Sequence, residues 1–117
     1  MALSYFINRK RSTCVITFSG SISPNDTEVL ETCLKEATSE PARYYVLNLG
    51  GLQAVEPGAS RPFTRFQQEL RQGSRLYLCD LQGEAGRTLK AEGLVRESEL
   101  QPDLLTALQA ILNEVKG

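Results

Sequence analysis

Hydrophobic and polar residues alternate in two ways along the chain, and each way predicts a different element. In TCVITFSG, Cys14, Ile16 and Phe18 recur at every second position, which is typical of a half-buried strand. RYYVLNL and RLYLCDL are short, nearly continuous apolar runs, which predict inner strands. Elsewhere, apolar residues spaced three and four apart predict amphipathic helices.

These patterns predict nine elements. Two strands over 5–9 and 13–19 are joined by the polar RKRS turn, and Gly20 ends the second strand. An inner strand is predicted over 44–49, a second one in RLYLCDL, and a weak edge strand in VRESEL. Helices are predicted over 24–39 and in the segments PFTRFQQELRQG, GEAGRTLKAEGL and PDLLTALQAILNEV.

Capping residues indicate where the first helix begins. Ser23 is a good N-cap, Pro24 suits the first helical position, and Asp26 completes a capping box. The last helix carries an apolar stripe that we expect to face the core. This stripe consists of Leu104, Leu105, Leu108, Ile111, Leu112 and Val115.

Two prolines and a glycine crowd the start of the second helix, in VEPGASRPF. Proline fits only the first turn of a helix, because deeper in the helix its missing N–H costs about 3 kcal/mol. Pro62 therefore predicts a helix that begins after Ala59, with Ser60 as its N-cap and Arg61 as its first residue. EPGA is then an irregular loop. The inner face of this helix carries Phe63, Phe66 and Leu70, and Gly73 ends it.

The order of elements predicts the fold class. Inner strands that alternate with helices imply parallel crossovers and an α/β fold. The first hairpin makes the sheet mixed. We expect one domain over residues 1–117, with a mostly parallel sheet of about five strands and about four helices.

Composition and charge indicate which classes of partner can be expected. Hydrophobic residues make up 41% of the chain and charged residues 23%, as in ordinary globular domains. The net charge of -1 argues against nucleic acid, and the lack of a long apolar run argues against membrane insertion. We expect a cytoplasmic protein. Cys14, Cys33 and Cys79 each lie in an apolar pattern, which predicts buried free thiols.

The residue types present argue against an enzyme. The sequence contains no histidine, which excludes histidine-based catalysis and histidine metal ligands. It shows neither a phosphate-binding glycine loop nor carboxylates at metal-ligand spacing. Glu56 and Asp80 are isolated carboxylates without a neighbouring nucleophile. We therefore expect neither a cofactor nor a metal site.

The order of elements and several motifs resemble one family. FSGSISPNDTEVLETCL matches a strand, a glycine and a first helix, and VLNLGGLQAVEPGAS stands where this family has a strand, a turn and Asp-Ser-Ser-Gly. QGSRLYLCDLQ and LKAEGL match in kind. From about Phe6 to Leu112, the chain resembles a STAS domain, the module of bacterial anti-sigma-factor antagonists and sulfate-transporter tails.

The resemblance also shows a departure. In family members that are switched by phosphorylation, the second serine of Asp-Ser-Ser-Gly accepts the phosphate. Aligned with this chain, the four positions fall on Glu56, Pro57, Gly58 and Ala59, so the acceptor position holds Gly58 and has no hydroxyl. Ser60, two residues later, is a weak substitute. The usual phosphorylation switch is therefore not expected here.

The resemblance implies a protein-interaction module in bacterial signalling and transcription regulation. Its partner would be an anti-sigma-factor or kinase-like protein. Two alternative functions stay open: a STAS subunit of a lipid-transport ATPase or a stress-signalling assembly, and a small-ligand module using Ser23, Glu56 and Gln82. A second copy of the chain, in a homodimer, stays open as a further partner. Loops that follow parallel strands gather at one edge of the sheet and predict the binding surface. Its expected residues are Ser23, Asn25, Glu56, Gly58, Ser60, Arg61, Thr64 and Gln82.

Overall fold

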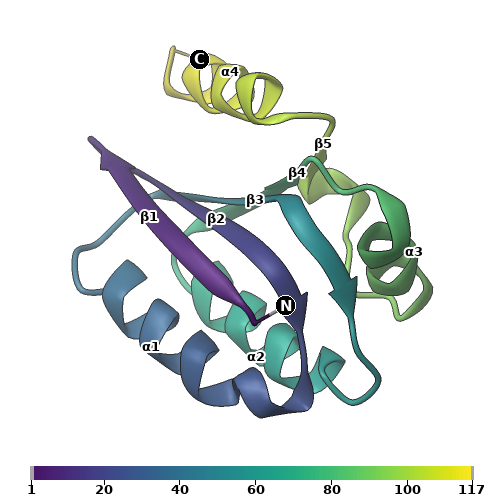
Figure 1. Cartoon of the computed structure of the whole chain (residues 1–117). Coiled ribbons are helices and arrows are strands. Elements are labelled where there is room, and N and C mark those ends of the chain that lie inside the picture. Colours follow the sequence, from purple (N-terminus) through teal and green to yellow (C-terminus); the bar gives the residue numbers. More distant parts are fainter. Residues whose placement is uncertain (1, 117) are drawn as a thin grey trace.

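The computed structural model describes residues 2–116 and contains one five-stranded sheet with helices on both faces (Figure 1). The strands are β1 (Ser4–Lys10), β2 (Thr13–Ile22), β3 (Tyr44–Val55), β4 (Arg75–Cys79) and β5 (Leu100–Gln101). The helices are α1 (Thr27–Ala37), α2 (Ser60–Arg71), α3 (Gly83–Ala91) and α4 (Leu104–Lys116).

The strand order is β1-β2-β3-β4-β5, with β1 antiparallel to β2 and the other pairs parallel. The predicted α/β fold, with a mixed five-stranded sheet and four helices, is confirmed. The edge strand predicted in VRESEL is shorter and later than expected. Glu97–Glu99 forms a 3₁₀ turn, and the two-residue β5 begins at Leu100.

The main core lies between the sheet and helices α1 and α2, which lie side by side along one face (Figure 1). Phe18 of β2 contacts the rings of Phe63 and Phe66 on α2 at centroid distances of 6.3 and 5.6 Å. Cys14, Ile16 and Leu70 are buried in the same core. Their burial and the aromatic contacts together confirm the predicted inner faces of β2 and α2.

The first helix begins in two steps. Pro24–Asp26 forms a 3₁₀ turn, and α1 follows from Thr27 and ends at Ala37, two residues before the predicted end. The predicted capping box is confirmed. The Ser23 N–H donates to the Asp26 carboxylate at 2.7 Å, and the Asn25 N–H donates to the Ser23 hydroxyl at 3.3 Å.

Strands β2 and β3 are longer than the sequence predicts. Gly20 does not end β2, and β3 continues through Gly50 and Gly51 beyond its predicted end at residue 49. A Cβ at Gly51 would lie 2.9 Å from the carbonyl oxygen of Phe18 and 2.9 Å from the hydroxyl of Ser19. Glycine is therefore required for close approach of the two backbones and not for chain reversal.

Helix α4 covers the opposite face of the sheet above β3 and β4, where Ala107 and Ile111 pack on Tyr44 and Tyr77 (Figure 1). The predicted inner stripe is only partly correct. Ile111 is buried and Leu104 is half-buried, but the rest of the stripe is exposed, since the sheet beneath α4 covers only one side of the helix. The exposed members are Leu105, Leu108, Leu112 and Val115.

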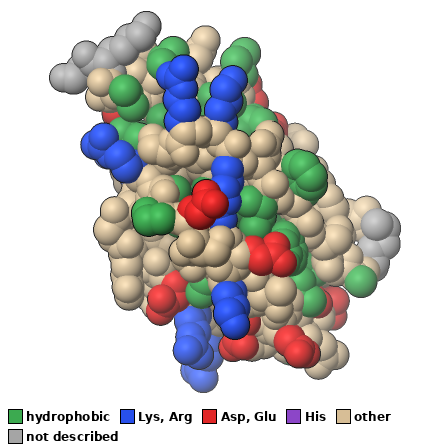
Figure 2. All heavy atoms as spheres, turned by 90° about the vertical axis from the view of Figure 1, so that its left-hand side faces the viewer, with side chains coloured by type: hydrophobic (Ala, Val, Ile, Leu, Met, Phe, Trp, Pro, Cys, Tyr) green, Lys and Arg blue, Asp and Glu red, His purple; other side chains and the backbone are tan. Residues whose placement is uncertain are grey.

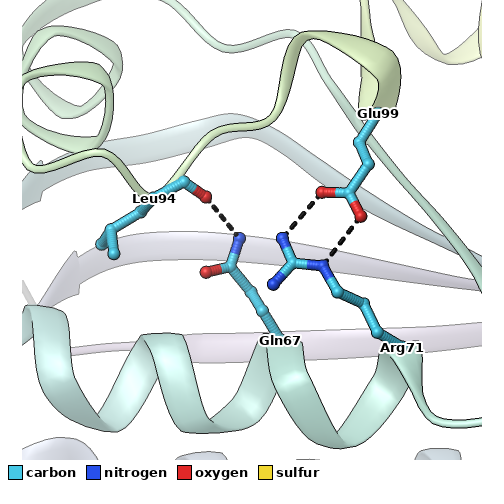
Figure 3. A network of polar contacts seen from close by, with 4 residues as sticks. All are labelled: Gln67, Arg71, Leu94 and Glu99. Atoms are coloured by element: carbon cyan, nitrogen blue, oxygen red, sulfur yellow. Dashed lines mark hydrogen bonds and ion pairs between the residues drawn. The ribbon is translucent and has the colours of Figure 1, made fainter.

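An ion pair between Arg71 and Glu99 links α2 to the segment before β5 (Figure 3). The Arg71 guanidinium donates to both carboxylate oxygens of Glu99 at 2.7 and 2.8 Å, and the two side chains are only 16% and 10% exposed. Beside this pair, the Gln67 amide donates to the carbonyl of Leu94 at 3.1 Å. Both contacts hold the chain that follows α3 against α2.

Breaking this pair should destabilise the fold. Glu99→Ala leaves the Arg71 charge in a mostly buried place, so the free energy of unfolding should fall by about 2–4 kcal/mol in a urea titration. The surface pair Arg75–Glu114 is 51% and 33% exposed, so Arg75→Met should cost less than about 1 kcal/mol. Equal losses for Glu99→Ala and Arg75→Met would contradict the assigned role of Arg71–Glu99.

All three cysteines should react slowly with thiol reagents. Cys14, Cys33 and Cys79 are free and buried, as predicted. Burial raises the pKa of Cys33 and Cys79 to about 12 and also raises the pKa of Cys14, so few thiolates form near neutral pH. Labelling of the native chain should stay slow until denaturant is added. Fast native labelling of all three would contradict this placement.

Candidate functional site

The loops that follow β2 and β3 meet at one edge of the sheet. The Glu56 N–H donates to the carbonyl of Ile22 at 2.8 Å, which ties the end of β3 to the end of β2. A Cβ at Gly58 would lie 3.3 Å from Cγ of Pro24, so the two loops touch. We call Ser23–Asp26 together with Glu56–Thr64 the loop face. It lies where binding sites form in open parallel sheets.

A tight turn explains the Pro-Gly sequence in this face. Gly58 has φ +86°, and the Ala59 N–H donates to the carbonyl of Glu56 at 3.1 Å. Proline at the second position and a glycine with positive φ at the third are the features of a type II turn. Gly58 is therefore needed for its backbone conformation and for its closeness to Pro24.

Helix α2 begins after Ala59, as predicted, but its cap differs from the prediction. Ala59 occupies the N-cap position without a side-chain hydrogen bond, and Ser60 is already the first helical residue. The turn brings the Ala59 methyl into the core, where it is fully buried, and thereby moves Ser60 into the helix. Ser60 is thus not the N-cap. Pro62 is the third helical residue, where no intrahelical donor is lost.

Seven of the eight predicted site residues belong to the loop face. Asn25, Glu56, Gly58 and Arg61 are exposed. Ser23, Ser60 and Thr64 are half-buried. The Thr64 hydroxyl donates to the carbonyl of Ser60 at 2.8 Å, and the Ser23 hydroxyl lies 3.0 Å from the Asp26 carboxylate.

Gln82 is placed differently. Gln82 is the N-cap residue of α3. A Cβ at Gly50 would lie 3.2 Å from Cβ of Asp80, so the chain just before Gln82 lies beside the middle of β3. Strand β4 pairs with β3 only as far as Asn48, whereas β3 continues to Val55. The continuation of β3 therefore places the Glu56 loop several residues beyond the chain that leads to Gln82.

One residue that supports the loop face is missed by the sequence reasoning. Pro24 lies at the predicted start of the first helix and is not among the predicted site residues, yet its ring lies against Gly58. The local sequence signals the proline but not its neighbour, because the contact joins loops from two different strands.

The groups on the loop face suit recognition. It presents exposed side chains of opposite charge, Glu56 and Arg61, beside backbone and hydroxyl groups. Among residues 2–116, no three His, Cys, Asp or Glu side chains are grouped so that they could hold a metal ion. Within the same range, no helix is both long and apolar enough to cross a membrane.

The STAS domain family model matches residues 6–107. This chain is a STAS domain. The match covers both loops of the loop face and all of α2 and α3, and it ends inside α4. A search of curated protein sequences gave no match.

Solved structures show the same fold at low sequence identity. An anti-sigma factor antagonist from Mycobacterium paratuberculosis superposes with a TM-score of 0.79 at 16% identity, with 93% of each chain covered. An RsbS variant from Moorella thermoacetica gives 0.77 at 15% identity, covering 97% of this chain and 98% of the other. A sulfate transporter family protein from Wolinella succinogenes gives 0.75 at 14% identity, covering 91% and 89%.

The turn predicts a measurable cost at Gly58. Gly58→Ala should lower the free energy of unfolding by about 1–2 kcal/mol, because a side chain disfavours positive φ, and the contact with Pro24 should add to this loss. Gly73 is the matched control, since it has φ +78° and a methyl group added there would have nothing within 4 Å. Urea unfolding should show a larger loss for Gly58→Ala than for Gly73→Ala. An equal or smaller loss would contradict the packing of Gly58 on Pro24.

Proposed function

We propose that this STAS domain is a non-catalytic protein-interaction module in bacterial signalling, similar in role to the anti-sigma-factor antagonists. Its partner, an anti-sigma-factor or kinase-like protein, binds the loop face. The proposal rests on the exposed loop face and on the structural relationship to an anti-sigma factor antagonist.

We further propose that serine phosphorylation at the usual family position does not regulate this binding. The observation that supports this step is Gly58, which has φ +86° and packs on Pro24. The resemblance aligns this glycine with the serine that accepts phosphate in other family members. Glycine has no hydroxyl to phosphorylate, and the turn conformation favours glycine over serine. Ser60 is the nearest hydroxyl along the chain, in the first turn of α2.

A second candidate function is a STAS subunit of a lipid-transport ATPase or of a stress-signalling assembly. The similarity to a sulfate transporter family protein supports the transport part of this candidate. In this case the loop face would bind another subunit. The protein captured from the source cell separates the two functions, since a kinase-like protein supports the first and a transporter subunit supports the second.

Reversing the charge of Arg61 should weaken partner binding. Arg61 is exposed at the start of α2, so Arg61→Glu should leave the fold intact and place a like or unpaired charge in the contact. We expect at least about tenfold weaker binding to the captured partner, equivalent to about 1.4 kcal/mol. Calorimetry with the purified partner measures this directly.

Lys35→Glu is the matched control. Lys35 is exposed in the last turn of α1 and lies beside Arg9 and Ser39, at the end of the sheet opposite the loop face. Partner binding by Lys35→Glu should equal that of the parent. If Arg61→Glu stays folded and also binds like the parent, the loop face is not the interface.

The phosphorylation step has its own test. A serine kinase that modifies STAS relatives should leave the mass of the intact chain unchanged, and treatment with that kinase should leave partner binding unchanged. Phosphate on Ser60 with loss of binding would show that a shifted switch exists.

A further inference from the structure

The outer flank of α4 exposes a continuous row of hydrophobic side chains. Leu105, Leu112 and Val115 are 68%, 51% and 60% exposed, and Leu108 is 38% exposed. Single exposed hydrophobic residues are common on protein surfaces, but a contiguous set marks an interaction site. The family match ends at residue 107, so most of this row lies beyond the matched region.

The spacing of this row suits a second helix. The four residues follow each other at intervals of three, four and three, which is the a and d spacing of a two-helix seam. The acidic residue Glu114 points to the sheet instead, where its carboxylate accepts from the Tyr77 hydroxyl at 2.8 Å and pairs with Arg75 at 3.3 Å. The row itself consists only of leucine and valine side chains, and the neighbouring Glu114 is held by contacts with Tyr77 and Arg75.

The sheet next to α4 is open as well. Helix α4 packs on β3, β4 and β5, while no helix of residues 2–116 lies above the same face of β1 and β2 (Figure 1). On this open half, Phe6 is 66% exposed and Val15 is half-buried at the edge of the α4 cluster. Helix α4 runs antiparallel to β3 and β4. Because the helix is right-handed, this direction places the apolar row on the side of α4 that faces β1 and β2.

We propose that this surface binds a second copy of the same chain through an antiparallel pair of α4 helices. A twofold axis through the row places Leu105 opposite Val115 of the second copy and Leu108 opposite Leu112 of the second copy. The row of one copy then packs against the same row of the other copy, as a twofold-symmetric interface requires. The α4 helix of each copy also covers the open half of the other copy's sheet, including Phe6.

Charges at the two ends of α4 favour the antiparallel arrangement. Asp103, just before the helix, is exposed, and its carboxylate accepts from the Thr106 N–H at 2.8 Å. The contact of Glu114 with Arg75 places the other end of α4 at the end of the sheet that carries the β1–β2 turn, with Lys10 and Arg11. Basic and hydrophobic side chains lie together at the top of this end (Figure 2). An antiparallel pair brings Asp103 of one copy toward the basic turn of the other.

The oligomeric state tests the proposal. Sedimentation over a range of concentrations should show a dimer for the parent chain. The double variant Leu108→Glu with Leu112→Glu should dissociate at least about tenfold more readily, because it places unpaired charges in the seam. Both positions are exposed in one copy, so circular dichroism should show an unchanged fold.

Gln109→Glu with Asn113→Glu is the matched control. Both residues are exposed on the same helix but outside the apolar row, so the added charge is equal and the dimer should persist.

Cysteine cross-linking tests the direction of the pair. A mixture of Leu105→Cys and Val115→Cys chains should form a disulfide between the two kinds of chain under mild oxidation. Leu105→Cys alone should cross-link poorly, because an antiparallel pair holds two copies of residue 105 at opposite ends. The native cysteines are buried and should not compete.

Three results would overturn the proposal. The first is a parent chain that stays monomeric up to its solubility limit, including the case in which a helix of another protein occupies the row. The second is a folded Leu108→Glu, Leu112→Glu variant that dimerises like the parent. The third is efficient cross-linking of Leu105→Cys with itself, which would indicate a parallel pair.

Discussion

The close approach of β2 and β3 is the constraint on which the loop face depends. Beyond Asn48, β3 no longer pairs with β4, but it continues to pair with β2 as far as Val55. The two backbones can approach there because Gly51 has no side chain, and a Cβ would lie 2.9 Å from the carbonyl of Phe18. A larger residue at this point would separate the strands and, with them, the two loops that they carry.

Much of the fold was predictable because its signals are local. The alternation around Ile16 and the capping box at Ser23 each depend on a few neighbouring residues, and the structure agrees with both. Pro62 likewise lies in the first turn of α2, one position later than predicted. Features set by distant partners were not predictable. Gly50 and Gly51 look like a turn until β2 is placed beside them, and Arg71 meets a carboxylate 28 residues away.

The candidate site shows the same division. Its loops were predicted, since carboxyl ends of parallel strands share an edge, but the length of β3 moved the Glu56 loop away from the chain before Gln82. The sequence could not show that Ala59 replaces Ser60 as the N-cap, because this depends on burial of the Ala59 methyl. Likewise, the periodicity of α4 shows that the helix is amphipathic but not which flank meets the sheet.

The proposed protein-binding role of the loop face rests on its exposed side chains and on the family to which the chain belongs. The most direct measurement is hydrogen–deuterium exchange of the chain alone and in complex with the partner captured from its source cell. Binding at the loop face should slow exchange in residues 22–26 and 56–64. Protection confined to other segments, with unchanged exchange in both loops, would contradict it.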